Sequence, residues 1–162
     1  MNSEILHTRL QQQGFESALQ KAILSVLVAA DIIRREHSAV VSSADINHNQ
    51  YNILRILKGR YPEGYCRKDI IERMMEKAPD VTRLIDALVT KGLAERIPSA
   101  EDKRMSLTKI TEKGLNELNH INPSMTQFNE SLSQYLNSME AEQLADLCSK
   151  IIQMDVQKGD SK

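Results

Sequence analysis

The residues with the clearest chemistry lie in one run, VTRLIDALVTKGLAERIPSAEDKR, between Val81 and Arg104. Thr82 and Arg83 come just inside the start of a predicted helix, away from its apolar side. A helix that enters the major groove of DNA offers such N-terminal side chains to base edges, and the planar fork of Arg meets two acceptors of guanine. Thr contacts a phosphate or a thymine methyl group. A Thr-Arg pair alone is more often a solvated polar face, so the DNA hypothesis depends on the segment that comes after the helix.

A predicted β-hairpin follows this helix directly. Leu93–Ile97 and Arg104–Ile110 are predicted as its strands, with Pro98–Lys103 as a polar tip that carries charges of both signs. Asp102 is placed to hold the guanidinium of Arg104 through a bidentate pair, and a preorganised Arg suits a narrow minor groove. A salt-bridged surface turn is the alternative for the tip. Helix and hairpin together predict a winged helix with contacts in adjacent grooves.

Apolar residues at helical spacing predict the elements that position this run. A stripe of four- and three-residue steps predicts a helix over 15–33, broad enough to pack on more than one neighbour, in the same subunit or in another copy. Asn47 and Gln50 have the spacing of a capping box, which predicts a helix from there to Gly59. A turn is predicted at 62–64 and a short helix from Cys66.

Residues typical of helix starts and ends predict the remaining helices. Pro79 fits the first position of the helix that carries Thr82, with Asp80 at its positive end and Gly92 just beyond its C-cap. After the hairpin, Thr111 is expected to cap a helix that Pro123 kinks or interrupts, and Ser138 to cap the last helix. The expected fold is mainly α with a small β-hairpin wing: a winged helix-turn-helix domain over 47–114, between helical regions over 1–46 and 115–162.

Charge is unevenly distributed along the chain. The formal net charge is −1, but residues 47–114 hold 14 Lys and Arg against 10 Asp and Glu, whereas the remaining residues hold 7 against 12. This distribution favours a nucleic-acid partner modestly, although the overall balance does not. A random fluctuation of charge is the alternative.

Other classes of function find little support. No apolar run approaches the roughly 20 residues that span a bilayer, and no secretory signal is evident, so we expect a cytoplasmic protein without membrane contact. Cys66 and Cys148 lie far apart and form no CxxC pair, which fits a reducing compartment. The four His lack metal-ligand spacing, and nucleotide-binding and hydrolase motifs are missing. We therefore expect no enzyme, no metal and no other cofactor.

The segment from Asn47 to Gly114 resembles the MarR family of transcriptional regulators. The resemblance rests on the order VTRLIDALVTKGLAER, then DKR, then the ending Ile110-Thr111-x-x-Gly114, while the flanking helices match the family's layout more loosely. It implies a homodimer in which helices of 1–46 and 115–162 interlock with those of the other copy. It further implies a regulator, most often a repressor, that binds double-stranded DNA at a pseudo-palindromic operator and responds to a small ligand or to oxidation.

By this resemblance, Thr82 and Arg83 fall at recognition-helix positions, and Asp102 and Arg104 form the wing-tip pair. Four basic residues are secondary DNA-contact candidates that can touch phosphates alone: Lys103, Arg96, Arg67 and Lys68.

The resemblance also implies an effector cleft between the dimer helices and the DNA-binding region. His48, Tyr51 and Arg55 begin the helix expected to line it, which favours a small aromatic or anionic effector; ordinary surface and packing roles are the alternative. Cys66 stands at a helix N-terminus beside Arg67, a setting that lowers a thiol pKa, although a passive N-cap is the more common use of such a residue.

Two other functions stay open at this stage. One is a winged helix that binds a protein instead of DNA, and the other is a thiol-sensing regulator that uses Cys66. Binding of random duplex at low salt distinguishes the first from a DNA-binding protein, and thiol reactivity at neutral pH tests the second.

Overall fold

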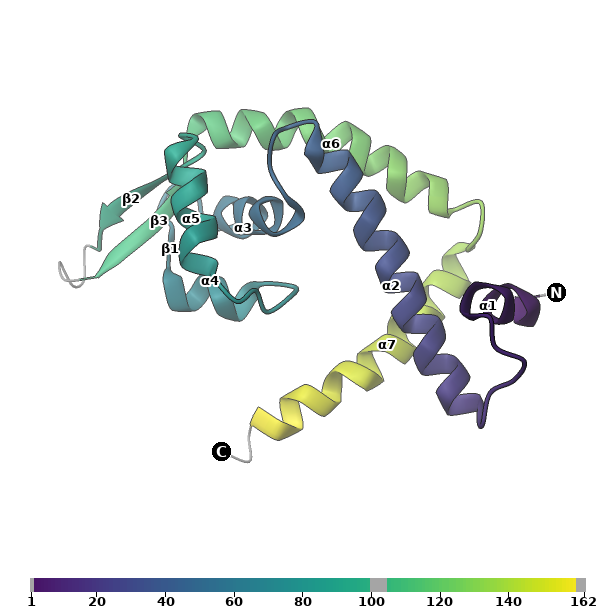
Figure 1. Ribbon diagram of the computed structural model, residues 1–162. Coiled ribbons are helices and arrows are strands. Elements are labelled where there is room, and N and C mark those ends of the chain that lie inside the picture. Colours follow the sequence, from purple (N-terminus) through teal and green to yellow (C-terminus); the bar gives the residue numbers. More distant parts are fainter. Residues whose placement is uncertain (1, 100–104, 160–162) are drawn as a thin grey trace. The chain divides into compact units, whose positions relative to one another are not determined.

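The computed structural model describes residues 2–99 and 105–159 and is mainly helical with one small antiparallel sheet (Figure 1). The elements in chain order are α1 (Asn2–Leu10), α2 (Ala18–Ser42), α3 (His48–Lys58), β1 (Tyr65–Cys66), α4 (Arg67–Arg73), α5 (Val81–Thr90), β2 (Ala94–Pro98), β3 (Ser106–Ile110), α6 (Glu112–Leu132) and α7 (Ser138–Gly159). The expected fold class, helical with a β wing, is confirmed. No helix within 2–99 and 105–159 has the length and apolar character needed to cross a membrane.

The chain divides into two compact units, Met1–Ile121 and Asn122–Lys162. The boundary falls within α6, next to Pro123, which lies inside this helix. Proline removes one backbone donor from a helix interior. A kink or an interruption was expected at Pro123; the helix continues to Leu132, so the interruption does not occur.

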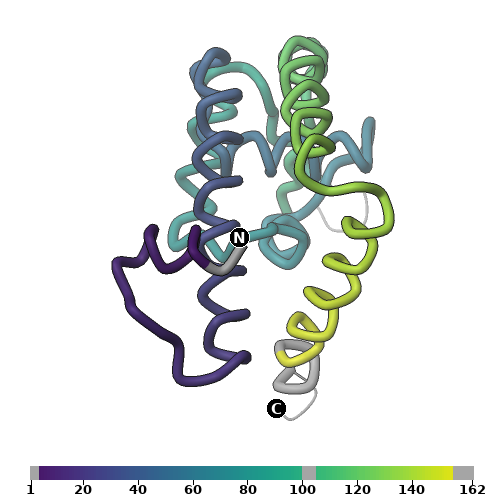
Figure 2. Tube along the Cα trace, turned by 90° about the vertical axis from the view of Figure 1, so that its right-hand side faces the viewer, coloured from purple at the N-terminus to yellow at the C-terminus, as the bar shows by residue number. Residues whose placement is uncertain are grey.

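Helix α2 begins later and ends later than its apolar stripe predicts. Ser17 is its N-cap and accepts from the backbone N–H of Gln20 at 3.1 Å. Phe15 therefore lies before the helix, where its ring packs on that of His7 with centroids 4.6 Å apart. Figure 2 traces α2 as one continuous helix. Its length places nine residues beyond Ile33, the last position of the predicted stripe, before it ends at Ser42.

The core of the first unit forms around α3. The capping box is confirmed: Asn47 Oδ1 accepts from the Gln50 backbone, and Gln50 Oε1 accepts from the Asn47 backbone. Because this cap fixes the first residue of the helix, it also fixes which side chains face the interior, and these are mainly apolar. Fully buried side chains from α3 and the elements around it are Ile53, Leu54, Leu57, Ile70, Ile85, Leu88, Ile110 and Leu118.

The wing is a three-stranded sheet in the order β1-β3-β2, with Thr108 on the central strand opposite Tyr65 and Arg96. The predicted hairpin accounts for β2 and β3. Strand β1 was not predicted, because two residues are too few to show an alternating pattern. The Tyr61 hydroxyl donates to Glu112 Oε1 at 2.5 Å, which ties the loop before β1 to the start of α6.

The ends of α5 follow the sequence pattern with one shift. Asp80 is the N-cap itself, and its carboxylate accepts from the backbone N–H of Arg83, so Pro79 precedes the helix and does not occupy its first position. At the other end, Lys91 is the C-cap and Gly92 adopts a φ of 70°, the left-handed conformation expected just beyond a helix. This turn leads the chain directly into β2.

The second unit holds the end of α6 and helix α7. A capping box starts α7, with reciprocal hydrogen bonds between Asn137 and Glu140. Asn137 is therefore the cap in place of the predicted Ser138, because the Asn side chain and the carboxylate three residues later satisfy both orphan amides. Figure 2 shows α7 in yellow as a single helix. Its apolar side chains Leu144, Leu147 and Ile151 are exposed in the single chain.

Candidate nucleic-acid interface

Arg83 projects from the first turn of α5 into solvent. Its side chain is 88% exposed, and its Nε lies 2.9 Å from Asp80 Oδ2. The other oxygen of Asp80 accepts from the Arg83 backbone at 3.1 Å. One carboxylate thus both caps the helix and orients the guanidinium, which leaves Arg83 available at the N-terminal end of α5.

Thr82, next to Arg83, faces a different neighbour. It is half-buried, and its Oγ1 accepts from Arg67 Nη1 at 3.2 Å. Arg67 is the first residue of α4, so this hydrogen bond joins the N-terminal turns of the two helices of the helix-turn-helix. The structure therefore brings together two residues that the sequence analysis named separately.

Arg96 reaches across from the sheet to the same helix. Its Nη2 lies 2.6 Å from Asp86 Oδ1, which links β2 to the middle of α5. Arg67, Thr82 and Arg96 then border one hollow of about 290 Å³, together with Ile85, Ser106 and Thr108. Two guanidinium groups and three hydroxyl groups on one surface are donors suited to phosphate oxygens.

Lys68 lies outside this group. Its side chain is exposed on α4, and Nζ is 3.8 Å from Glu72. Three polar residues that border or support the hollow were not predicted as site residues: Ser106, Thr108 and Asp86. Hydroxyls at alternate positions of a strand give a weak signal of their own, and Asp86 is recognisable only once β2 is known to pack beside α5.

The wing-tip residues Asp102, Lys103 and Arg104 lie outside the described residues. The proposed bidentate pair between Asp102 and Arg104 therefore stays a prediction.

The effector candidates occupy successive turns of α3. Tyr51 is buried, and its hydroxyl accepts from Arg55 Nη1 at 3.1 Å. His48 is half-buried one turn earlier, with its ring 5.6 Å from that of His37 on α2. The structure thus brings Tyr51 and Arg55 together and places His48 against α2, while an effector role for the three residues is untested.

The two thiols are free and half-buried. Cys66 stands at the N-cap of α4, as predicted, but its side chain makes no capping hydrogen bond. Sensing by Cys66 remains a prediction.

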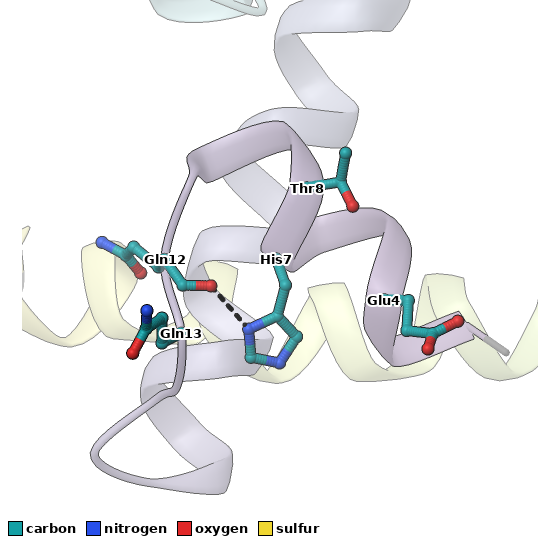
Figure 3. A pocket seen from close by; sticks show the side chains of 5 residues that line it. All are labelled: Glu4, His7, Thr8, Gln12 and Gln13. Carbon is teal, nitrogen blue, oxygen red and sulfur yellow. Dashed lines mark hydrogen bonds between the residues drawn. The ribbon is translucent and has the colours of Figure 1, made fainter.

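A second hollow, of about 440 Å³, lies on α1 and the turn after it (Figure 3). Glu4, His7, Thr8, Gln12 and Gln13 line it. His7 Nδ1 donates to the carbonyl of Gln12 at 2.9 Å, because a carbonyl oxygen can only accept. None of these residues was predicted to be functional, and the hollow is polar without a cluster of cations.

A short helix-turn-helix of α4 and α5, followed by an antiparallel wing whose Arg96 pairs with Asp86 of the second helix, defines a winged helix-turn-helix DNA-binding protein. Comparison with known proteins gives the same class. The model of the MarR family matches residues 46–106. The uncharacterised HTH-type transcriptional regulator YpoP of Bacillus subtilis (strain 168) is 30% identical over 119 residues, which are 74% of this chain and 82% of that protein.

Solved structures agree. The crystal structure of a MarR transcription factor from Planctomyces limnophilus is similar with a TM-score of 0.64 and 31% identity, over 84% of this chain and 98% of that one. The transcriptional repressor CouR, solved with a 23-mer DNA duplex, shares the fold with a TM-score of 0.70 at 20% identity, over 80% of this chain and 90% of that one. The chain belongs to the MarR family: it is a winged helix-turn-helix, DNA-binding transcriptional regulator and not an enzyme.

Proposed function

We propose that the protein is a homodimeric repressor that binds a pseudo-palindromic operator in the cytoplasm and is released by a small aromatic or anionic effector. In this proposal residues 47–114 contact DNA, and the helices of 1–46 and 115–162 form the dimer. The observation that carries the proposal is the exposed Arg83 at the N-terminal end of α5, beside the hollow bordered by Arg67 and Arg96.

In this proposal, different residues make different contacts with DNA. Arg83 is free to enter the major groove and read base edges. Arg67 and Arg96, which hold hydroxyl and carboxylate partners on the protein, are suited to the phosphates that run between the recognition helix and the wing. Lys68 adds a further positive charge on the same helix as Arg67.

Dimerisation is supported by apolar side chains on α2 that a single chain leaves in water. Leu19, Ile23 and Leu27 follow one another at four-residue steps and are 70%, 48% and 60% exposed. Exposed apolar area of this kind stabilises an interface by about 25 cal/mol per Å² that is buried. A large exposed apolar face marks an interaction site. The same face on a second copy can bury it in a two-fold symmetric interface.

Repression and release are the finer part of the proposal. The CouR repressor shares this fold, which supports repression here only by analogy of fold. The pair of Tyr51 and Arg55, with His48 one turn away, offers a cation and ring surfaces to an anionic aromatic molecule. Thermal-shift screening of small aromatic acids against the wild type and Arg55→Ala tests this site.

The decisive experiment measures DNA binding and assembly together. Genomic fragments upstream of the gene and its divergent neighbour are footprinted, and the bound complex is sized by sedimentation. We expect one dimer per site, with half-sites about 10 base pairs apart, and an affinity that falls steeply with salt. A protein that stays monomeric at micromolar concentration, or that ignores every fragment at modest ionic strength, contradicts the proposal.

A further inference from the structure

Two ion pairs and one ring contact join α2 and the loop after it to residues 47–114. Arg34 Nε lies 2.7 Å from Glu76 Oε1 in the segment before α5, and Asp45 Oδ2 lies 2.9 Å from Lys91 Nζ at the end of α5. Between them in sequence, His37 of α2 packs against His48 of α3, with ring centroids 5.6 Å apart and planes tilted by 32°. Of these three contacts, only the ring contact is made by imidazoles, the side chains whose ordinary pKa lies closest to neutral pH.

His48 is poorly placed to carry a positive charge. It is the first residue of α3, where the helix dipole is positive. Its Nδ1 is buried and has no hydrogen-bond partner among the described residues. Protonation of Nδ1 would create a buried donor without an acceptor, which is unfavourable in addition to the charge.

His37 favours its neutral form. Burial lowers the pKa of His37 below its ordinary value of 6.5, and the neighbouring His48 lowers it further. Arg34, one turn before His37, pairs with Glu76, and Arg55, two turns after His48, bonds to the hydroxyl of Tyr51.

We propose that the His37–His48 pair is a proton-sensitive joint between α2 and the DNA-binding region. With both rings neutral the joint is closed and α2 holds α3 in place. Uptake of protons at mildly acidic pH sets two imidazolium ions against each other, loosens α2 from α3 and weakens operator binding. The DNA readout depends on the proposed function, whereas the joint itself does not.

The direction of the pH dependence comes from linkage. A His whose pKa is lowered by folding binds fewer protons in the folded chain than in the unfolded one. Its contribution to stability is complete above the unfolded value of about 6.5 and is lost as the pH falls through the lower, folded value. The relevant window therefore lies below about pH 6.5.

The test compares the wild type with His37→Gln, His48→Gln and the double variant, and uses His120→Gln as the matched control because His120 is exposed on α6. Histidine ring NMR titrations, unfolding midpoints and operator Kd are measured from pH 5.5 to 8 at constant ionic strength with EDTA present. EDTA removes any effect of a metal bound between the two rings. His48→Phe keeps a ring at this position without a titrating group, in case the Gln variants unfold.

We expect the titration of His37 in the wild type to be depressed and to depend on the presence of His48. We also expect its affinity for DNA to fall below pH 6.5 by up to about tenfold per pH unit for each proton taken up. The double variant and His48→Phe should lose most of this pH dependence, while His120→Gln should keep it. A His37 ring that titrates near 6.5 independently of His48, or variants with the pH profile of the wild type, would overturn the proposal. Absence of DNA binding at every pH contradicts the proposed function, and the titrations and unfolding midpoints then still decide on the joint.

Discussion

At the scale of single residues, the acidic partners of the interface arginines determine what each arginine can do. Arg83 and Arg96 both pair with an aspartate of the α5 region, Asp80 and Asp86, and all four side chains are substantially exposed. Exposed ion pairs of this kind contribute little to stability, typically about 0–1 kcal/mol. Each guanidinium can therefore exchange its carboxylate partner for a DNA acceptor at small cost.

Replacement of Arg83 tests its assignment to a base contact. We expect Arg83→Ala to weaken binding to the cognate operator by about 1–3 kcal/mol, because one bidentate contact to guanine is lost. Fluorescence anisotropy at fixed salt, with cognate and random duplexes, measures the change. Arg35→Ala removes an equal charge from α2 and serves as the control. Equal loss on both duplexes would reassign Arg83 to a phosphate.

Asp86 offers a prediction of opposite sign. Asp86→Asn removes a negative charge beside the hollow and releases Arg96 from its ion pair. Binding of any duplex should then tighten by about 0.5 kcal/mol, roughly twofold, with no gain in sequence preference. Titrations at two salt concentrations check this, since an electrostatic gain shrinks at high salt. Weaker binding would mean that Asp86 is needed to hold Arg96 in position.

Residue types were predictable from the sequence, but their partners were not. Thr82 and Arg83 were identified because a hydroxyl and a cation near a helix start suit DNA, and Arg67 and Arg96 were identified by the resemblance to the MarR family. That Arg67 bonds to Thr82, and that Arg96 bonds to Asp86, depends on how α4, α5 and β2 are arranged. Local sequence carries no information on contacts of this kind, since they join residues 10 and 15 positions apart on different elements.

At the scale of elements, Gly114 shows why the turn from the wing into α6 requires its particular residues. Thr111 Oγ1 accepts from the Gly114 backbone at 3.1 Å and donates to the carbonyl of Gly92 at 2.7 Å. A β-carbon on Gly114 would overlap the carbonyl oxygen of Leu93. The start of α6 therefore packs directly on the backbone that opens β2, and the wing is anchored to this helix.

Gly114→Ala is expected to destabilise the fold by about 1–3 kcal/mol, because a backbone carbonyl cannot move aside as a flexible side chain does. Urea unfolding followed by circular dichroism measures the change. Gly14→Ala is the matched control, since nothing lies within 4 Å of its added carbon, and it should change stability by less than about 0.5 kcal/mol. Similar midpoints for the two variants would contradict the close packing at Gly114.

Elements were predictable wherever a cap marked their ends. The Asn47 box, Gly92 and Thr111 are local signals, since the hydrogen bonds and the φ angle involve residues a few positions apart. Errors arose where two local signals competed: Ser138 follows a better cap at Asn137, and Pro79 precedes one at Asp80. Strand β1 depends on pairing with β3, some 40 positions later, and has no local signal at all.

At the scale of the whole molecule, the terminal helices carry apolar faces that are exposed to solvent in the single chain. On α2 the face is formed by Leu19, Ile23 and Leu27, and on α7 by Leu144, Leu147 and Ile151. Large apolar side chains in such numbers on two helices exceed the scattered exposure that is normal for a monomer. The periodicity of α2 predicted this face, but a single sequence does not show which surface covers it.

A charge on the α2 face tests whether a second copy covers it and whether operator binding needs that copy. Ile23→Glu places a carboxylate at the centre of the face, so burial against a partner would require its desolvation, whereas the isolated chain would keep its fold. We expect a monomer by sedimentation at micromolar concentration, with a helical content equal to that of the wild type.

Operator affinity of Ile23→Glu should fall by at least about 100-fold, because two linked half-site contacts become one. Ala39→Glu introduces the same charge at an exposed position on the opposite side of α2 and should remain dimeric with nearly unchanged affinity. A dimeric Ile23→Glu variant would place the interface elsewhere. A monomeric variant with undiminished affinity would show instead that one winged helix suffices for the operator, and the symmetric arrangement of half-sites would then have no role in recognition.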